Sequence, residues 1–205
     1  RLLRDGPDNA LAFVEAVPEN TPGDFRRRLR RRFVNQTAKM DPHVAKKVAR
    51  QWTAGDGADA ALLRILAINW SKTGDPQEMM EWLGSLDAGV SYGASDEGIR
   101  EGYRAWLNAD QDAAYAWALD QPQSRRLEPA KSMYAFSIAK ESPEQALAIA
   151  ALVEDDQTRE AVTLKILRAW SVVDPVAADS WMAENGISVE QQARLKKRRP
   201  VTGRK

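Results

Sequence analysis

A single histidine and several acid clusters are the side chains best suited to catalysis or metal binding. His43 follows Pro42 at the start of an expected helix. A metal site needs several clustered ligands, and a catalytic triad needs a nucleophile and an orienting acid around its base. We therefore predict that the His43 ring is solvated. The chain has no cysteine, which excludes disulfides and thiolate zinc sites but fits either a reducing or an oxidising compartment.

One acid cluster resembles the start of a calcium loop. Asn108, Asp110 and Asp112 have the spacing of the first three EF-hand ligands. The position that requires glycine is Ala113, and the position that requires a bidentate glutamate is Leu119. The sequence therefore excludes an EF-hand at this cluster.

Other catalytic patterns are also missing from the sequence. Residues 154–156 (Glu-Asp-Asp) are interpreted as a turn whose acids cap the next helix. The chain has neither a phosphate-binding glycine loop nor a Gly-x-Ser-x-Gly elbow. We predict no catalytic residue, no metal and no cofactor, and that the chain is not an enzyme. The alternative is a pair of distant carboxylates meeting across a groove, as in glycosidases.

A run of arginines is the most unusual feature of the sequence. Residues 26–32 contain six arginines and no acid. Phe25, Leu29 and Phe33 recur at every fourth position, which predicts an apolar stripe that docks this helix on its neighbour. The candidate binding residues are those predicted to point away from the stripe, namely Arg26, Arg27, Arg30 and Arg31.

The charge of the rest of the chain leaves three interpretations of the arginines open. Without these six and the six cations that follow Leu195, 18 basic and 29 acidic residues remain, a net charge of about −11. The arginines can pair with acids of neighbouring elements or of a second copy. They can instead contact phosphate or another polyanion, which arginine binds in a bidentate manner. Contact with a membrane surface is the third interpretation.

A repeated helix-start signal predicts the elements that position these side chains. An N-cap residue accepts a hydrogen bond from the first helical turn, and proline suits the next position. This signal recurs every 32–35 residues if one site without proline is included. Glu78 is expected to complete a capping box with Asp75. The six sites are Gly6-Pro7, Asp41-Pro42, Asp75-Pro76, Asp110-Gln111, Ser142-Pro143 and Asp174-Pro175.

Small and large side chains recur at fixed distances from each of these helix starts. Three residues into five of the six helices stands alanine, which lets the helix lie close to its partner. Large residues follow three positions later. Tryptophans also stand shortly before three of the six helix starts. Large rings therefore lie on both sides of the same turn, and we expect them to pack across the hairpin. We predict that the tryptophans form core contacts between helices. They are Trp52, Trp70, Trp82, Trp106, Trp117, Trp170 and Trp181.

The predicted fold class is all-α, a right-handed α-solenoid of about six antiparallel helical hairpins. Apolar residues follow helical spacing, and no segment alternates with period two, so no sheet is expected. Residues 1–192 are predicted to form a single helical-repeat domain. Residues 193–205 contain Pro200 and Gly203 and are predicted to be a basic, disordered tail.

The sequence resembles the tetratricopeptide repeat. The resemblance rests on Gly74-Asp75, on the residue four positions after that Asp, and on units near 34 residues. It implies protein–protein recognition on a concave face, without catalysis.

We therefore predict an interaction or scaffolding module whose partner is another protein or a peptide. The alternative is binding of nucleic acid or another polyanion through the helix at residues 25–33 and the basic tail. No apolar run is long enough to span a membrane. Because the chain begins at Arg1, we expect a processed product or a fragment of a longer protein.

Overall fold

The computed structural model describes residues 6–18, 21–54, 59–86, 89–121, 124–188 and 190–192. Within these ranges the fold is all-helical, as predicted, and one isolated antiparallel bridge joins Ala54 to Val90. The chain separates into two compact units, residues 1–130 and residues 131–205. The predicted tail, residues 193–205, lies outside the described residues, and the single array over residues 1–192 stays a prediction.

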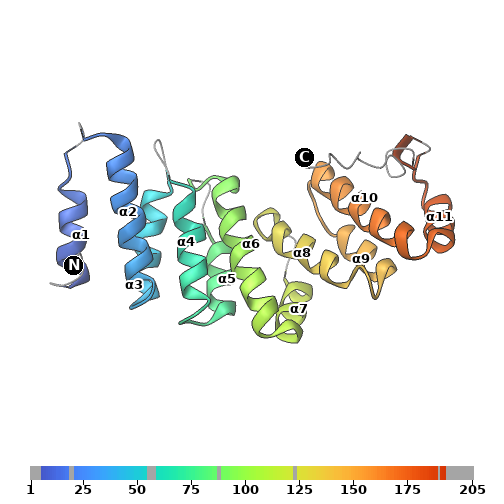
Figure 1. Ribbon diagram of the computed structural model, residues 1–205, viewed down its shortest axis with the longest axis horizontal. Coiled ribbons are helices and arrows are strands. Elements are labelled where there is room, and N and C mark those ends of the chain that lie inside the picture. The colour runs from blue at the N-terminus through green and yellow to red at the C-terminus, as the bar shows by residue number, and fades with distance from the viewer. Residues whose placement is uncertain are drawn as a thin grey trace, which may run out of the picture. The chain divides into compact units, whose positions relative to one another are not determined.

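The first unit begins with seven helices and a short 3-10 turn (Figure 1). They are α1 (Pro7–Glu15), α2 (Gly23–Thr37), α3 (Pro42–Trp52), α4 (Ala61–Trp70), α5 (Pro76–Gly84), α6 (Tyr92–Ala109), α7 (Gln111–Asp120) and η1 (Arg125–Leu127). The boundary between the units falls within α8 (Glu128–Ile138). The second unit continues with α9 (Pro143–Ala150), α10 (Asp156–Val173) and α11 (Pro175–Glu184).

The predicted helix starts are confirmed at all six sites, and four of them carry the predicted side-chain cap. At each of these four, an aspartate carboxylate accepts a hydrogen bond from a backbone N–H of the first turn. Ser142 was expected to cap α9 in the same way, but it makes no such bond, and Pro143 at the first helical position sets the start. The four capping residues are Asp41, Asp75, Asp110 and Asp174.

The capping box expected at α5 is wrong. Asp75 accepts bonds from the N–H groups of Gln77 and Glu78, as a cap should. The Glu78 carboxylate, however, accepts a bond of 3.2 Å from Lys46 Nζ of α3. An opposite charge on the preceding hairpin therefore draws Glu78 away from its own helix start.

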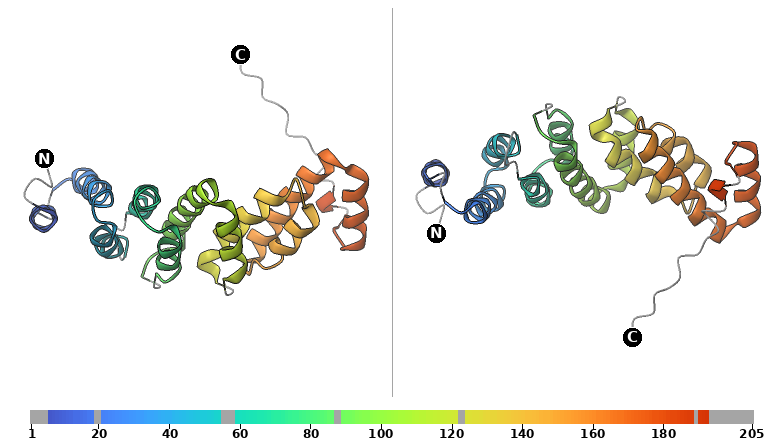
Figure 2. Two further views of the ribbon diagram at one scale, coloured as in Figure 1. Left: turned by 90° about the horizontal axis from the view of Figure 1, so that it is seen from below. Right: turned by 90° about the horizontal axis from the view of Figure 1, so that it is seen from above.

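Alternate helices of the first unit pack side by side. α2 lies against α4, and α4 against α6. The views of Figure 2 look roughly along these helices and show α3 and α5 in a second row beside them. Two glycines let α6 approach closely: a Cβ at Gly98 would lie 3.1 Å from Leu63 Cβ, and one at Gly102 would lie 2.6 Å from Met79 Cε.

Tryptophans pack across the turns of the first unit, as predicted. The ring centroids of Trp70 and Trp82 lie 6.0 Å apart, and those of Trp106 and Trp117 lie 5.5 Å apart. Five of the seven tryptophans are buried, and the other two, Trp82 and Trp181, are half-buried. The core interpretation therefore holds for five of them.

In the second unit, α9 and α11 both pack against α10. Leu147 of α9, Ile166 and Leu167 of α10, and Met182 of α11 are buried between these helices. Lys165 Nζ lies 4.0 Å from the ring centroid of Phe136, which attaches the end of α8 to α10. The helices α9, α10 and α11 thus share one small core.

Candidate functional site

The arginines of α2 are the first candidate, and one of them forms a bidentate ion pair. Arg31 Nε and Nη2 donate to the two carboxylate oxygens of Asp59 at 2.6 and 2.7 Å. The Asp59 side chain is only 3% exposed. The hydrogen bond that Arg31 donates to Asp59 raises the pKa of Arg31. This pair fits the hypothesis that the arginines balance acids of neighbouring elements.

The other three candidate arginines also hold partners within the first unit. Arg26 donates to the Pro18 carbonyl. Arg27 pairs with Asp24 of its own helix. The Arg30 guanidinium lies 5.2 Å from the centroid of the Trp52 ring. Burial lowers the pKa of Arg30, and the nearby charge of Arg26 lowers it further.

Two arginines that were not among the candidates are the ones left without partners. Arg28 and Arg32 are exposed and, within the described residues, make no ion pair or hydrogen bond. The buried face of α2 consists of Phe33, Val34 and Thr37, whereas the sequence stripe predicted Phe25 on it. Phe25 is 47% exposed. Because the real buried face is rotated toward Val34, Arg28 and Arg32 point to solvent.

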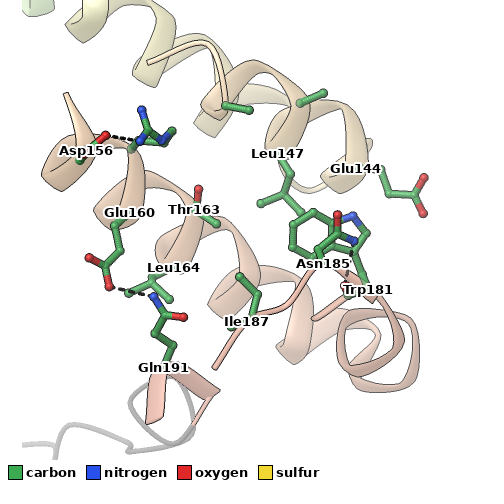
Figure 3. Close-up of a pocket in the computed structure, with 13 residues that line it drawn as sticks. Glu144, Leu147, Asp156, Glu160, Thr163, Leu164, Trp181, Asn185, Ile187 and Gln191 are labelled. Carbon is green, nitrogen blue, oxygen red and sulfur yellow. Dashed lines mark hydrogen bonds and ion pairs between the residues drawn. The ribbon is translucent and has the colours of Figure 1, made fainter. Parts of the chain in front are cut away.

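A pocket of about 590 Å³ in the second unit is the second candidate. Its apolar floor comes from all three helices and from the segment after α11 (Figure 3). Leu147 belongs to α9, Leu164 to α10 and Trp181 to α11, and Ile187 follows α11. We call this site the α9–α11 pocket.

Helical spacing explains why these side chains meet. On α10, Glu160, Thr163 and Leu164 stand three and four residues apart and therefore share one face. Trp181 and Asn185 stand four apart at the end of α11. On α9 the face consists of Glu144, Leu147, Ala148 and Ala151. The two alanine side chains are small and leave room in the pocket that Trp181 also lines.

Polar and acidic groups border the floor. Glu160 accepts a hydrogen bond of 3.1 Å from Gln191 Nε2, and Asp156 pairs with Arg159. Asn185 Nδ2 donates to the Trp181 carbonyl at 2.9 Å, which leaves its Oδ1 facing outward as an acceptor. The border therefore combines negative charge with hydrogen-bonding groups around an apolar centre.

The sequence did not predict this pocket. Trp181 occupies a repeat position that the sequence pattern assigned to the core, so burial was expected there. The small side chains at Ala148 and Ala151 were the available signal, but they also occur in ordinary tightly packed helices. The cavity depends on which helices face each other, and that is set by tertiary contacts.

The lone histidine is exposed, as predicted. His43 Nδ1 lies 3.7 Å from the Glu78 carboxylate, and the imidazole and Trp70 ring centroids lie 6.2 Å apart. In the part of the chain that the structure describes, no three His, Asp or Glu side chains are grouped to hold a metal ion. None of the described helices is both long and apolar enough to cross a membrane.

The chain was compared with protein-family models, curated proteins and solved structures, and none of them matches it. A function can therefore be inferred only from the α2 arginines and the α9–α11 pocket.

Proposed function

We propose that this chain is a non-catalytic protein-interaction module that binds a segment of another protein in the α9–α11 pocket. In this proposal the helices form a right-handed, tetratricopeptide-like α-solenoid of about six hairpins. The side-by-side packing of α2, α4 and α6 supports the repeat, as do the six helix starts that recur every 32–35 residues. Repeat proteins of this kind commonly use an extended surface for recognition.

The observation that carries the proposal is the half-buried Trp181 ring, which lines the pocket together with Leu164 and Ile187. Tryptophan is enriched among the residues that dominate protein interfaces, because one ring supplies a large apolar contact. Covering an apolar surface removes it from water at roughly 25 cal/mol per Å². A partner side chain inserted between Trp181 and Leu164 would gain this energy.

The test compares two half-buried tryptophans. Partner proteins are captured from a lysate of the native host with the wild-type chain, with Trp181→Ala and with Trp82→Ala. We expect a partner that binds wild type and Trp82→Ala but is lost with Trp181→Ala. The purified partner should repeat this order of affinities. If both variants retain the same bound proteins as wild type, the proposed use of the pocket is wrong.

Polyanion binding through α2 is the second candidate function, supported by Arg28 and Arg32, which are exposed and form no ion pair among the described residues. The basic residues after Leu195 would add to it. Binding of a labelled single-stranded DNA should weaken with salt, with a log–log slope of about −0.7 per phosphate neutralised. Replacing Arg28 and Arg32 by alanine should weaken it further, whereas Lys72→Ala should not. Salt-independent binding, or none, would exclude this candidate.

A further inference from the structure

The charges around the α9–α11 pocket are unbalanced. Three acids and one cation line it: Glu144, Asp156, Glu160 and Arg159. Arg159 is already paired with Asp156. Among the described residues, neither Glu144 nor Glu160 forms an ion pair, and both are exposed. Two carboxylates are therefore available to a cation brought by a ligand.

The two available carboxylates flank the apolar floor. Figure 3 shows Glu160 on one side and Glu144 on the other, with Leu164, Ile187 and Trp181 between them. Each carboxylate stands about one helical turn from an apolar lining residue of its own helix, a separation of roughly 5–6 Å between Cβ atoms. A cation bound at either end would therefore lie beside an apolar group on the floor.

Polar groups on the floor suit a peptide main chain. The Thr163 hydroxyl lines the pocket and makes no side-chain hydrogen bond within the described residues. Asn185 keeps its Oδ1 as an acceptor, because its Nδ2 is already bonded to the Trp181 carbonyl. A peptide offers an N–H and a C=O at every residue, so it can satisfy both groups while its side chains reach the floor and the border.

From these features we infer that the pocket binds a peptide segment in which an apolar side chain is flanked by lysine or arginine. The apolar side chain lies against Trp181 and Leu164, and the flanking cations reach Glu144 and Glu160. This inference rests on the proposed function and adds the chemistry of the partner. An acidic segment would be repelled by the same two carboxylates.

The test uses a phage-displayed library of random peptides as the probe, selected on the full chain. Parallel selections use Trp181→Ala, which removes the floor, and the double variant Glu144→Gln/Glu160→Gln. The glutamines keep the side-chain volume and remove only the charge, and both positions are exposed, so this variant should fold as wild type does. Circular dichroism verifies the fold of each protein.

We expect peptides enriched on wild type to carry lysine or arginine beside an apolar residue and to be lost on Trp181→Ala. Synthetic versions should bind the double glutamine variant more weakly, by about two- to fivefold for each carboxylate, and should weaken as salt rises. Peptides that depend on Trp181 but show no preference for cations would overturn the inference and leave the proposed function standing. If no enrichment depends on Trp181, both fail.

Discussion

The α4–α5 and α6–α7 hairpins carry tryptophans at the same positions around the turn as α10–α11, but the two units use them differently. In the first unit the paired rings lie 6.0 and 5.5 Å apart across the turn. In the second unit Trp170 is 7% exposed, while Trp181 is half-buried and lines the pocket. One repeated sequence feature thus gives tryptophan pairs across the turn in the first unit and a pocket-lining ring in the second.

The neighbouring helices therefore determine whether a ring at this repeat position packs on another tryptophan or lines a pocket. In the first unit, Gly98 and Gly102 let α6 lie closely against α4 and α5. In the second, Ala148, Ala151 and Trp181 line the same pocket. The sequence motif determines which residues lie near a turn, but the neighbouring helix determines whether they are covered.

The largest effect expected from this comparison is the loss of a core tryptophan. Trp70→Ala should lower the free energy of unfolding by about 3–5 kcal/mol, because Trp70 is 1% exposed and packs on Trp82. Trp181→Ala should cost less than half as much, since its ring is half-buried. Urea denaturation followed by circular dichroism measures both. Equal costs would remove the distinction between the two units.

The residue before each capping aspartate should also differ between the two units in its contribution to stability. A Cβ at Gly74 would lie 2.3 Å from atoms of the Trp70 ring, so Gly74→Ala should cost about 1–3 kcal/mol through overpacking. The equivalent residue in α10–α11 is Val173, which is 69% exposed. Val173→Ala should therefore change stability by less than about 0.5 kcal/mol. Thermal unfolding of the two variants measures both changes in stability. If Gly74→Ala is neutral, Trp70 is not fixed against the turn.

Within α2, replacing an arginine that forms an ion pair should lower stability more than replacing one that forms none among the described residues. Arg31→Ala leaves the buried Asp59 carboxylate without its guanidinium, and we expect a loss of about 1–2 kcal/mol, below the value for a fully buried pair because Arg31 is 45% exposed. Arg28→Ala should be close to neutral. The midpoints of urea denaturation compare the stabilities of the two variants. A neutral Arg31→Ala would show that the pair contributes nothing to stability.

The helix caps are the feature that the two units share, and they should give the smallest and most equal effects. Asp75→Ala and Asp174→Ala should each cost about 0.5–2 kcal/mol, because each carboxylate caps a helix start. Ser142→Ala serves as the control, since Ser142 makes no cap bond. A cost at only one aspartate, measured by urea denaturation, would indicate that the units differ in their local structure as well as in their packing.

The helices could be predicted from sequence because the interactions that start them are local. Asp41 and Asp174 bond N–H groups two or three residues away, so their effect is visible in a short stretch of chain. Proline at the next position adds a second local signal. Ser142 shows the limit of this argument, because its helix starts as predicted but without the side-chain bond.

Neither site could be predicted in full, because both depend on contacts between distant residues. Arg31 and Asp59 are 28 residues apart, and nothing near either residue indicates the pair. The exposure of Arg28 follows from a small rotation of α2 toward Val34. Glu144 and Gln191 line one pocket only because α10 holds α9 and α11 on the same core. Sequence periodicity identifies helix faces but not the partner of each face.

The most direct test of the central claim is fluorine NMR of the chain labelled with 5-fluorotryptophan, with resonances assigned by single Trp→Phe variants. A peptide selected on the wild-type chain is then titrated in. We expect the Trp181 resonance to shift in proportion to binding, while those of the buried Trp70, Trp106 and Trp117 stay in place. Saturable binding that leaves Trp181 unchanged, or that moves the buried tryptophans instead, would contradict the assignment of the pocket as the binding surface.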